Sequence, residues 1–168
     1  MKMAEKQRKM AFICSKGNLD MVYPALIMGW AALGEGVDVT IFFTFWGQDM
    51  INKHRVDHLE IPPVSNSSMK MNMMGVPGYI GIPQFMGIIP GMTPFASAIM
   101  KKKMKNLDVP TVREYLKMMV DAGAKLYGCK MTCDLFGLKK EDFIDGVIDI
   151  VTASEFIEMS EGSQIIFI

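Results

Sequence analysis

Residues 125–137 read KLYGCKMTCDLFG, and this stretch predicts a buried strand that runs directly into a short helix. Residues 125–128 alternate in character and are short enough for a strand, whereas residues 132–136 suit one or two helical turns. Cys129 then lies where the strand ends and the helix begins. Free N–H groups and partial positive charge at a helix N-terminus stabilise a thiolate over a thiol. Cys129 is therefore the candidate centre of a functional site, and its position leaves open the alternative of a small buried core residue.

The preceding segments predict a parallel sheet. Residues 9–14 (KMAFIC) are a continuous apolar run of strand length, and residues 37–44 (VDVTIFFT) are a second strand, rich in β-branched and aromatic side chains. Between them, residues 21–33 predict a helix. Strand, helix and strand in so short a span require a right-handed βαβ crossover and a parallel sheet.

The helix over residues 21–33 also predicts self-association. No charged residue occurs between Asp20 and Glu35. A helix on the surface of a sheet normally keeps a polar outer stripe, so one that is apolar nearly all round must be covered on both sides. We therefore expect this helix to pack against another subunit in a homo-oligomer.

The ends of the predicted strands define a candidate site. In open parallel sheets the ligand crevice lies outside the carboxyl ends of the strands. The residues expected to share that edge are Ser15, Lys16, Gly17 and Asn18 after the first strand, Trp46 after the second, and Cys129.

A long insertion rich in Met, Pro and Gly occupies about residues 62–94. Loops of this length without structure of their own are usually functional or ordered by a partner. Residues 71–100 contain no charged residue and are long enough to cross a bilayer, but four prolines disfavour a regular spanning helix. We expect a loop that closes the site or binds a partner, with membrane contact through residues 71–100 as the lesser alternative.

The second half of the chain completes the predicted fold. A helix is expected from about residue 93 to residue 106, and the capping-box sequences TVRE (111–114) and TASE (152–155) predict two further helix starts. Residues 164–168 predict a terminal strand whose apolar end lies inside the sheet. The expected fold is a three-layer α/β/α, flavodoxin- or Rossmann-like domain over residues 1–168, with a mostly parallel sheet of about five strands.

Composition excludes some classes of function. Eighteen basic residues balance eighteen acidic ones and the pI is about 6.7, so nothing supplies the phosphate neutralisation that dominates nucleic-acid binding. Three cysteines at uneven spacing do not form a disulfide framework. They suit a reducing, cytoplasmic compartment.

The two late cysteines are separated by three residues. If both were helical, their Cβ atoms would lie about 5–6 Å apart, whereas a disulfide needs about 3.5–4.5 Å. A bond between them would therefore require local unwinding. Cys133 is a candidate resolving or second sulfur-carrying thiol, with a structural role as the alternative. Cys14, at the end of the first strand, is more typical of a core cysteine than of a site-lining one.

Metal and cofactor sites have weaker signals. His54 and His58, together with Cys129 and Cys133, match a zinc site in type, but the histidines fall in a polar segment typical of a solvated helix face. Methionines between residues 69 and 74 would suit Cu(I), yet methionine more often fills adaptable apolar interfaces. Residues 15–20 lack the known nucleotide-binding patterns. We expect no metal and no cofactor.

Several segments together resemble a known family. These are SKGNLDMVYPAL (15–26), TIFFTFWG (40–47), GCKMTCDLFGL (128–138) and the Met/Pro/Gly loop with its lysine cluster. They resemble the DsrE/DsrF-like sulfur-relay family, in the branch often labelled peroxiredoxin-like. The resemblance implies a three-layer α/β/α domain, homo-oligomers, and a cysteine, here Cys129, that carries sulfane sulfur as a persulfide. Members vary at the position of Cys133, so its role is not carried over.

The sequence therefore predicts a sulfur carrier or sulfurtransferase centred on Cys129, with Cys133 as a second thiol. Its partner would be a small sulfur-carrier protein or a low-molecular-weight persulfide. One rival is a non-catalytic homo-oligomeric binding module with a Met-rich docking loop. Another is a Cys129/Cys133 dithiol oxidoreductase, which predicts a reversible disulfide; peroxide reduction ranks lower because no peroxidase motif surrounds Cys129.

Overall fold

The computed structural model describes residues 7–62, 64, 70–71, 80–81 and 84–168. The chain divides into two compact units, one built from Met1–Leu59 and Pro110–Ile168 and the other from Glu60–Val109.

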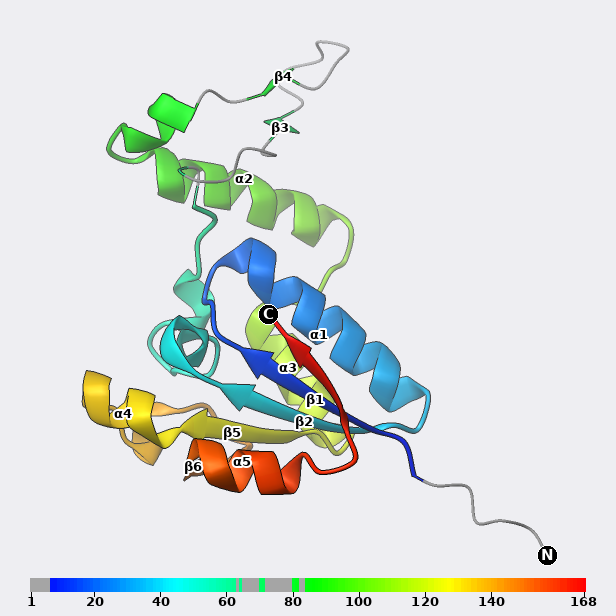
Figure 1. Ribbon diagram of the computed structural model, residues 1–168. Coiled ribbons are helices and arrows are strands. Elements are labelled where there is room, and N and C mark those ends of the chain that lie inside the picture. The colour runs from blue at the N-terminus through cyan, green and yellow to red at the C-terminus, as the bar shows by residue number, and fades with distance from the viewer. Residues whose placement is uncertain (1–6, 63, 65–69, 72–79, 82–83) are drawn as a thin grey trace, which may run out of the picture. The chain divides into compact units, whose positions relative to one another are not determined.

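A five-stranded parallel sheet forms the centre of the larger unit (Figure 1). In spatial order its strands are β6 (Val147–Val151), β5 (Lys125–Cys129), β2 (Asp38–Phe43), β1 (Lys9–Cys14) and β7 (Gln164–Phe167). Parallel strands buried on both faces read as nearly continuous apolar runs, which is why KMAFIC and DVTIFF become inner strands. The predicted α/β class and parallel sheet are confirmed.

Two helices cover one face of this sheet. They are α1 (Leu19–Gly34) and α3 (Val112–Asp121). Gly29 of α1 allows their close approach, because a Cβ there would lie 2.5 Å from the Met119 Cε of α3 and 3.7 Å from the Phe12 ring of β1. Phe12 therefore points to this face.

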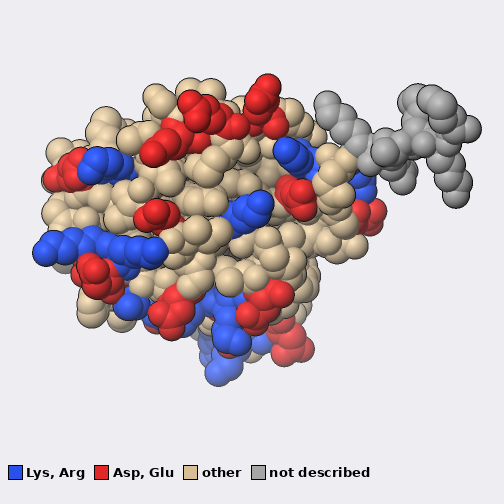
Figure 2. Space-filling view, turned by 90° about the horizontal axis from the view of Figure 1, so that it is seen from below, with Lys and Arg blue, Asp and Glu red and all other residues tan. Residues whose placement is uncertain are grey.

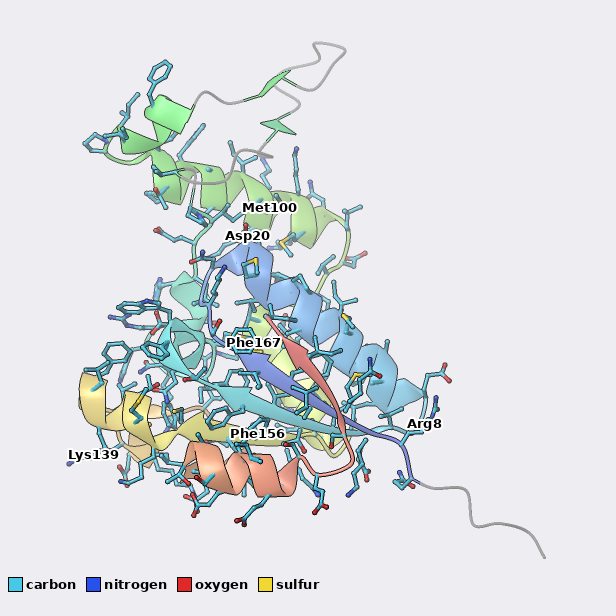
Figure 3. The ribbon with its side chains drawn as sticks, viewed as in Figure 1. Arg8, Asp20, Met100, Lys139, Phe156 and Phe167 are labelled. Atoms are coloured by element: carbon cyan, nitrogen blue, oxygen red, sulfur yellow. The ribbon has the colours of Figure 1, made fainter. Side chains whose placement is uncertain are left out.

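On the opposite face, the described part of the chain places α5 (Ala153–Met159). Its Phe156, labelled in Figure 3, stacks on Phe42 of β2. The two ring centroids lie 4.6 Å apart. Phe12 is in register with Ile41, so Phe42, one residue on, points away from Phe12. Helices on both faces give the predicted α/β/α layers.

Capping boxes begin two of these helices. The Thr111 hydroxyl accepts from the backbone of Glu114 at the start of α3, and Thr152 accepts from Glu155 at the start of α5. In both cases the glutamate side chain accepts in return from the cap backbone. Both predicted helix starts are therefore confirmed.

The terminal strand corrects a prediction. We expected the apolar end of the chain to lie inside the sheet, but β7 is an edge strand that pairs with β1. Phe167 is 69% exposed as a result. An apolar strand has the same pattern at an edge and in the interior, so the order of strands decides its burial. The opposite edge strand, β6, directly precedes the predicted capping box at Thr152, and the sequence analysis does not predict it by its residues.

The segment after β2 is not the continuous solvated helix expected around His54 and His58. It forms two short 3₁₀ helices, η1 (Phe45–Met50) and η2 (Val56–His58). Between them Asn52 pairs with Phe143, and the Ile51 carbonyl accepts from the Ile144 N–H at 2.8 Å. These long-range backbone bonds replace a continuous helix.

The smaller unit contains the predicted helix as α2 (Met92–Asn106), with 3₁₀ helix η3 (Gln84–Ile88) and the antiparallel pair β3 (Lys70–Met71) and β4 (Ile80–Gly81). The Ser97 hydroxyl accepts from the Ile61 N–H and donates to the Thr93 carbonyl. Much of the predicted insertion loop lies outside the described residues, so its closing or docking role stays a prediction.

Acidic and basic side chains are mixed on the face of the molecule drawn in Figure 2. This mixture is in keeping with a formal net charge of zero. Among the described residues, no helix has the length and apolar character needed to span a membrane.

Candidate functional site

Cys129 joins the end of β5 to the start of α4 (Lys130–Phe136). It occupies the cap position of that helix with an extended backbone, and Gly137 in the left-handed conformation, with φ of 66°, ends the helix. The side chain is 5% exposed and belongs to an apolar cluster with Phe42 and Phe156. Cys129 thus lies under α5 at the carboxyl edge of the sheet.

Hydrogen-bond donors converge on the Cys129 sulfur. Burial raises the pKa of this thiol. Hydrogen bonds from the Thr132 N–H, the Thr44 and Thr132 hydroxyls and the Met131 N–H lower it. The donors outweigh burial, and the pKa lies below the ordinary value of a cysteine. The site therefore favours the Cys129 thiolate more than an ordinary cysteine environment does.

The two hydroxyl groups are fixed by their own contacts. Thr132 is fully buried, and its Oγ1 accepts from the Phe45 N–H at 3.0 Å. The Thr44 and Thr132 Oγ1 atoms lie 3.3 Å apart. Phe45 has a positive φ of 45°, an unfavourable backbone conformation for a bulky residue. The turn after β2 therefore holds both donors in place before any ligand arrives.

Cys133 lies one helical turn further along α4 and is also buried. Burial raises the pKa of the Cys133 thiol, and the nearby Cys129 charge raises it further. A hydrogen bond from Gln48 lowers this pKa, but the net result is a raised value. The Gln48 Nε2 group donates to the Cys133 Sγ at 3.3 Å and to the Cys129 carbonyl at 2.9 Å. The two cysteines are thus chemically unequal neighbours.

Cys14 ends β1 at the same edge of the sheet but lies in the core. It is 1% exposed, and burial raises its pKa to about 12. A thiol that remains protonated and shielded is a poor nucleophile. The structure therefore gives Cys14 none of the activation that surrounds Cys129.

The remaining predicted site residues meet around η1. Gly17 lies against Trp46, because a Cβ on Gly17 would be 2.5 Å from the Trp46 carbonyl oxygen. Trp46 is 57% exposed and stacks on Phe136 of α4 with ring centroids 5.0 Å apart. The loop after β1, η1 and α4 are therefore brought together.

The other loop residues have structural partners or face solvent. The Ser15 N–H and hydroxyl both donate to the Ile168 carbonyl, at 2.7 and 3.0 Å. Asn18 occupies the cap position of α1 without a side-chain capping bond, and Lys16 is exposed. These contacts assign no chemistry to the three residues.

Three site residues were missed by sequence reasoning. They are Thr44, Gln48 and Thr132. Thr132 comes three residues after Cys129, the spacing at which a side chain in the first helical turn reaches back to its cap. Thr44 directly follows β2, the strand next to β5, and the sequence predicts it only as the last residue of that strand. Gln48 carries no sequence signal of its own beside Asp49, and only the fold directs its amide toward the cysteines.

Metal ligands do not gather in the described part of the chain. No group of three or more His, Cys, Asp or Glu side chains there is arranged to hold an ion. The activated group is the sulfur of Cys129 itself.

Fold and site together define an α/β protein with a hydrogen-bonded, thiolate-stabilising cysteine at the carboxyl edge of a parallel sheet. The chain belongs to the DsrE/DsrF/DrsH-like family, whose model matches residues 6–168. The family resemblance drawn from the sequence is confirmed.

Individual relatives span nearly the whole chain. A protein named sulfur carrier protein DsrE2, from Allochromatium vinosum, is 37% identical over 161 residues, covering 95% of this chain and 97% of that protein. The uncharacterized protein YrkE of Bacillus subtilis is 29% identical over 168 residues, covering 99% and 100%.

One solved structure supports the fold. The protein of unknown function MTH1491 from Methanobacterium thermoautotrophicum matches with a TM-score of 0.56 and 11% identity, covering 96% of this chain and 100% of that one. At this identity the likeness concerns the fold alone.

Proposed function

We propose that this protein is a sulfur carrier that holds sulfane sulfur as a persulfide on Cys129. The observation that carries the proposal is the set of donors on the Cys129 sulfur, from the Met131 and Thr132 backbone and the Thr44 and Thr132 hydroxyls. The name of the Allochromatium vinosum relative, a sulfur carrier protein, supports the same role. A thiolate is both the nucleophile and the acceptor in sulfur exchange.

Loading is a thiolate exchange at sulfur. The Cys129 thiolate attacks the outer sulfur of a donor persulfide, R–S–SH. A bond forms between the Cys129 Sγ and that sulfur, the donor S–S bond breaks, and the electron pair leaves as the donor thiolate, R–S⁻. No net oxidation occurs, and the proton stays on the outer sulfur.

Unloading uses the same chemistry in reverse. An acceptor thiolate attacks the outer sulfur, takes it as a new persulfide, and returns Cys129 to its thiolate form. The donors that lower the Cys129 pKa make it a good leaving group. The same four hydrogen bonds therefore favour both acceptance and release.

The burial of Cys129 restricts its partners. With only 5% of the residue exposed, the site admits a slender sulfur terminus rather than a broad surface. A low-molecular-weight persulfide or the extended end of a carrier protein meets this requirement. A cytoplasmic location stays a prediction from the cysteine content.

Self-association is supported by α1. Its outer surface exposes Ile27, Met28 and Trp30, which a monomer would leave in water. Coverage of this surface by a second copy would bury the apolar face that the sequence singles out. We therefore propose a homo-oligomer, with α1 at the interface.

The alternative functions predict different roles for the cysteines. A binding module with structural cysteines gives no reason for four donors to converge on one sulfur, so the site favours a carrier. A dithiol oxidoreductase uses the same low pKa at Cys129 but requires a bond to Cys133. In that case the Cys133 thiolate attacks the inner sulfur of loaded Cys129, and hydrosulfide, HS⁻, leaves as the disulfide forms.

Intact-mass spectrometry after exposure of the reduced protein to polysulfide tests the proposal. We expect a gain of one or more sulfur atoms that is lost in Cys129→Ser and retained in Cys133→Ser. Cys14→Ala is the matched control, since it removes a buried cysteine outside the site, and it should load normally.

Three outcomes would argue otherwise. A loss of two hydrogens that needs both Cys129 and Cys133 would favour the dithiol oxidoreductase. Loading that persists in Cys129→Ser would assign the sulfur to another residue. Failure of the unmodified protein to load, with Cys129 slow toward an alkylating reagent, would favour the binding module.

A further inference from the structure

Gln48 is a buried amide that connects the two cysteines. It is 1% exposed and belongs to η1, whereas both cysteines are contributed by the β5–α4 junction. Its Nε2 group donates to the Cys129 carbonyl at 2.9 Å and to the Cys133 Sγ at 3.3 Å. One amide nitrogen therefore fixes the distance between the backbone of the first cysteine and the sulfur of the second.

Packing alone does not explain this residue. Among the described residues, the Gln48 Oε1 atom is buried and has no hydrogen-bond partner. A buried amide oxygen without a partner is destabilising, and an apolar side chain of the same size would remove that cost. Buried unsatisfied groups call for a specific explanation, and this one lies directly beside two candidate sulfur-transfer thiols.

We propose that Gln48 is a positioning residue that makes Cys133 the second sulfur-carrying thiol of the site. Its N–H group would hold the Cys133 sulfur toward Cys129 and stabilise the Cys133 thiolate at the moment of attack. This inference rests on the proposed function, since it concerns the fate of sulfur already held on Cys129.

The transfer step balances without a further reagent. The Cys133 thiolate attacks the outer sulfur of the Cys129 persulfide, and a bond forms between that sulfur and the Cys133 Sγ. The bond to the Cys129 Sγ breaks, its electron pair remains on Cys129 as the thiolate, and the proton stays on the outer sulfur.

Geometry favours this transfer over a disulfide. The outer sulfur of a persulfide lies about 2 Å beyond the Cys129 Sγ, so it extends the reach of the first cysteine by one bond. Direct bonding of two cysteines one helical turn apart would require the start of α4 to unwind. Transfer of the outer sulfur leaves the helix and the Gln48 contacts intact.

Electrostatics sets the order of events. The negative charge of an unloaded Cys129 opposes ionisation of Cys133, as do burial and Asp134, while Gln48 and Lys130 favour it. In the loading step the electron pair leaves with the donor thiolate, so the opposing charge on Cys129 is removed. The Gln48 N–H remains on Cys133 throughout, so the second thiol is readied after the first has been loaded.

The first experiment needs no sulfur transfer. In a Cys129→Ser background, the rate of Cys133 alkylation is followed against pH by peptide mapping for Gln48, Gln48→Leu and Gln48→Glu. Loss of the N–H donor should slow alkylation at pH 7.5 by about tenfold and move the pH midpoint upward. Gln48→Glu should be slower still, because it adds a carboxylate in place of the donor.

A matched control separates positioning from general loosening. Asn52 is another buried amide close in sequence, and its Oδ1 accepts from the His54 backbone. Asn52→Leu should leave the pH midpoint of Cys133 unchanged. The Lys130 and Asp134 charges are present in every variant, so they do not cause a difference in the midpoint between variants.

Two outcomes would overturn the proposal: an unchanged pH midpoint of Cys133 alkylation in both Gln48 variants, or faster alkylation at every pH. If Gln48→Leu does not fold, Gln48→Glu and Gln48→Met give the same comparison.

The second experiment follows sulfur itself. Protein with both cysteines is loaded with polysulfide, and the position of the added sulfur is mapped over time. We expect Gln48→Leu to load Cys129 as the parent does but to show about tenfold slower appearance of sulfur on Cys133. Equal transfer in the two proteins would overturn the role of Gln48. Failure of the parent to load Cys129 would instead overturn the proposed function, while the alkylation result would still report on Gln48.

Discussion

Cys14 and Cys129 occupy equivalent positions and have opposite chemistry. Both end parallel inner strands at the same edge of the sheet, and both are at least 95% buried, with 1% and 5% exposure. The pKa of Cys14 is raised to about 12 by burial, whereas donors bring the pKa of Cys129 below its ordinary value. Position at a strand end therefore does not activate a thiol by itself.

The difference lies in the segment that succeeds each strand. After Cys129 the chain turns at once into α4, and the Met131 and Thr132 N–H groups reach the sulfur. After Cys14 a loop intervenes before α1 begins at Leu19, and the Cys14 carbonyl accepts from the Thr44 N–H at 2.9 Å. Thr44, in the turn after β2, thus donates its N–H to the Cys14 carbonyl and its hydroxyl to the Cys129 sulfur.

The largest expected contrast is in thiol reactivity. Under native conditions at pH 7.5, iodoacetamide should modify Cys129 about a thousandfold or more faster than Cys14, because almost no Cys14 is ionised. Peptide mapping of the alkylated protein over time measures both rates. Urea-unfolded protein is the control, where the two thiols should react alike. Comparable native rates would remove the distinction between the two strand ends.

A second contrast concerns stability at alkaline pH. In the folded protein the Cys14 pKa is raised from 9.0 to about 12, so the unfolded chain loses this proton first as pH rises. The stability linked to Cys14 is thus present below pH 9 and decreases between pH 9 and pH 12. At pH 10.5 the loss should be about 2 kcal/mol relative to pH 8.

Urea unfolding at the two pH values measures this loss. Cys14→Ala should lower stability at pH 8 and show a decrease between pH 8 and pH 10.5 that is smaller by that amount. All other titrating groups are shared with the parent and cancel in the difference. A decrease of the same size in both proteins would contradict the raised pKa of Cys14.

The third test removes one donor from the activated cysteine. Thr132→Val keeps the shape of the side chain and the backbone N–H but loses the hydroxyl on the Cys129 sulfur. The pKa of Cys129 should rise, and its alkylation at pH 6.5 should slow by about tenfold. Stability should fall by about 1–3 kcal/mol, since the Phe45 N–H loses its acceptor. Thr132→Ser retains the hydroxyl, and if it behaves as Thr132→Val does, the hydroxyl is not the cause.

The smallest expected effect on stability is at Thr44. Thr44→Val removes a single hydroxyl on a partly buried residue and leaves the acceptor of the Phe45 N–H in place. Thermal stability should change little. Alkylation of Cys129 at pH 6.5 should slow by at least as much as with Thr132→Val, about tenfold, because the Thr44 hydroxyl lowers the Cys129 pKa no less than the Thr132 hydroxyl does. The pH profile of Cys129 alkylation, with Thr44→Ser as control, measures it. An effect on Cys129 alkylation clearly smaller than that of Thr132→Val would contradict this order of the two hydroxyls.

The sequence alone determined the fold class and the candidate centre of the site. Apolar runs of strand length, two capping boxes and the direct passage from KLYGC into KMTCDLF are local signals, and the structure contains each of them. They also carry the family resemblance over the whole chain. Cys129 stood out because helix initiation immediately after a strand is encoded by neighbouring residues.

The tertiary structure decided which strands are edges and which polar groups meet the cysteines. β7 has the pattern of an interior strand yet lies at the edge, since order in a sheet depends on crossovers between distant segments. Thr44 is 85 residues from Cys129 in the sequence. Gln48 is 81 residues from Cys129 and 85 residues from Cys133. Local sequence patterns report interactions between residues that are close in the sequence. The hydrogen bonds that distinguish Cys129 from Cys14, and that place Gln48 on Cys133, arise only when β2 and β5 lie side by side.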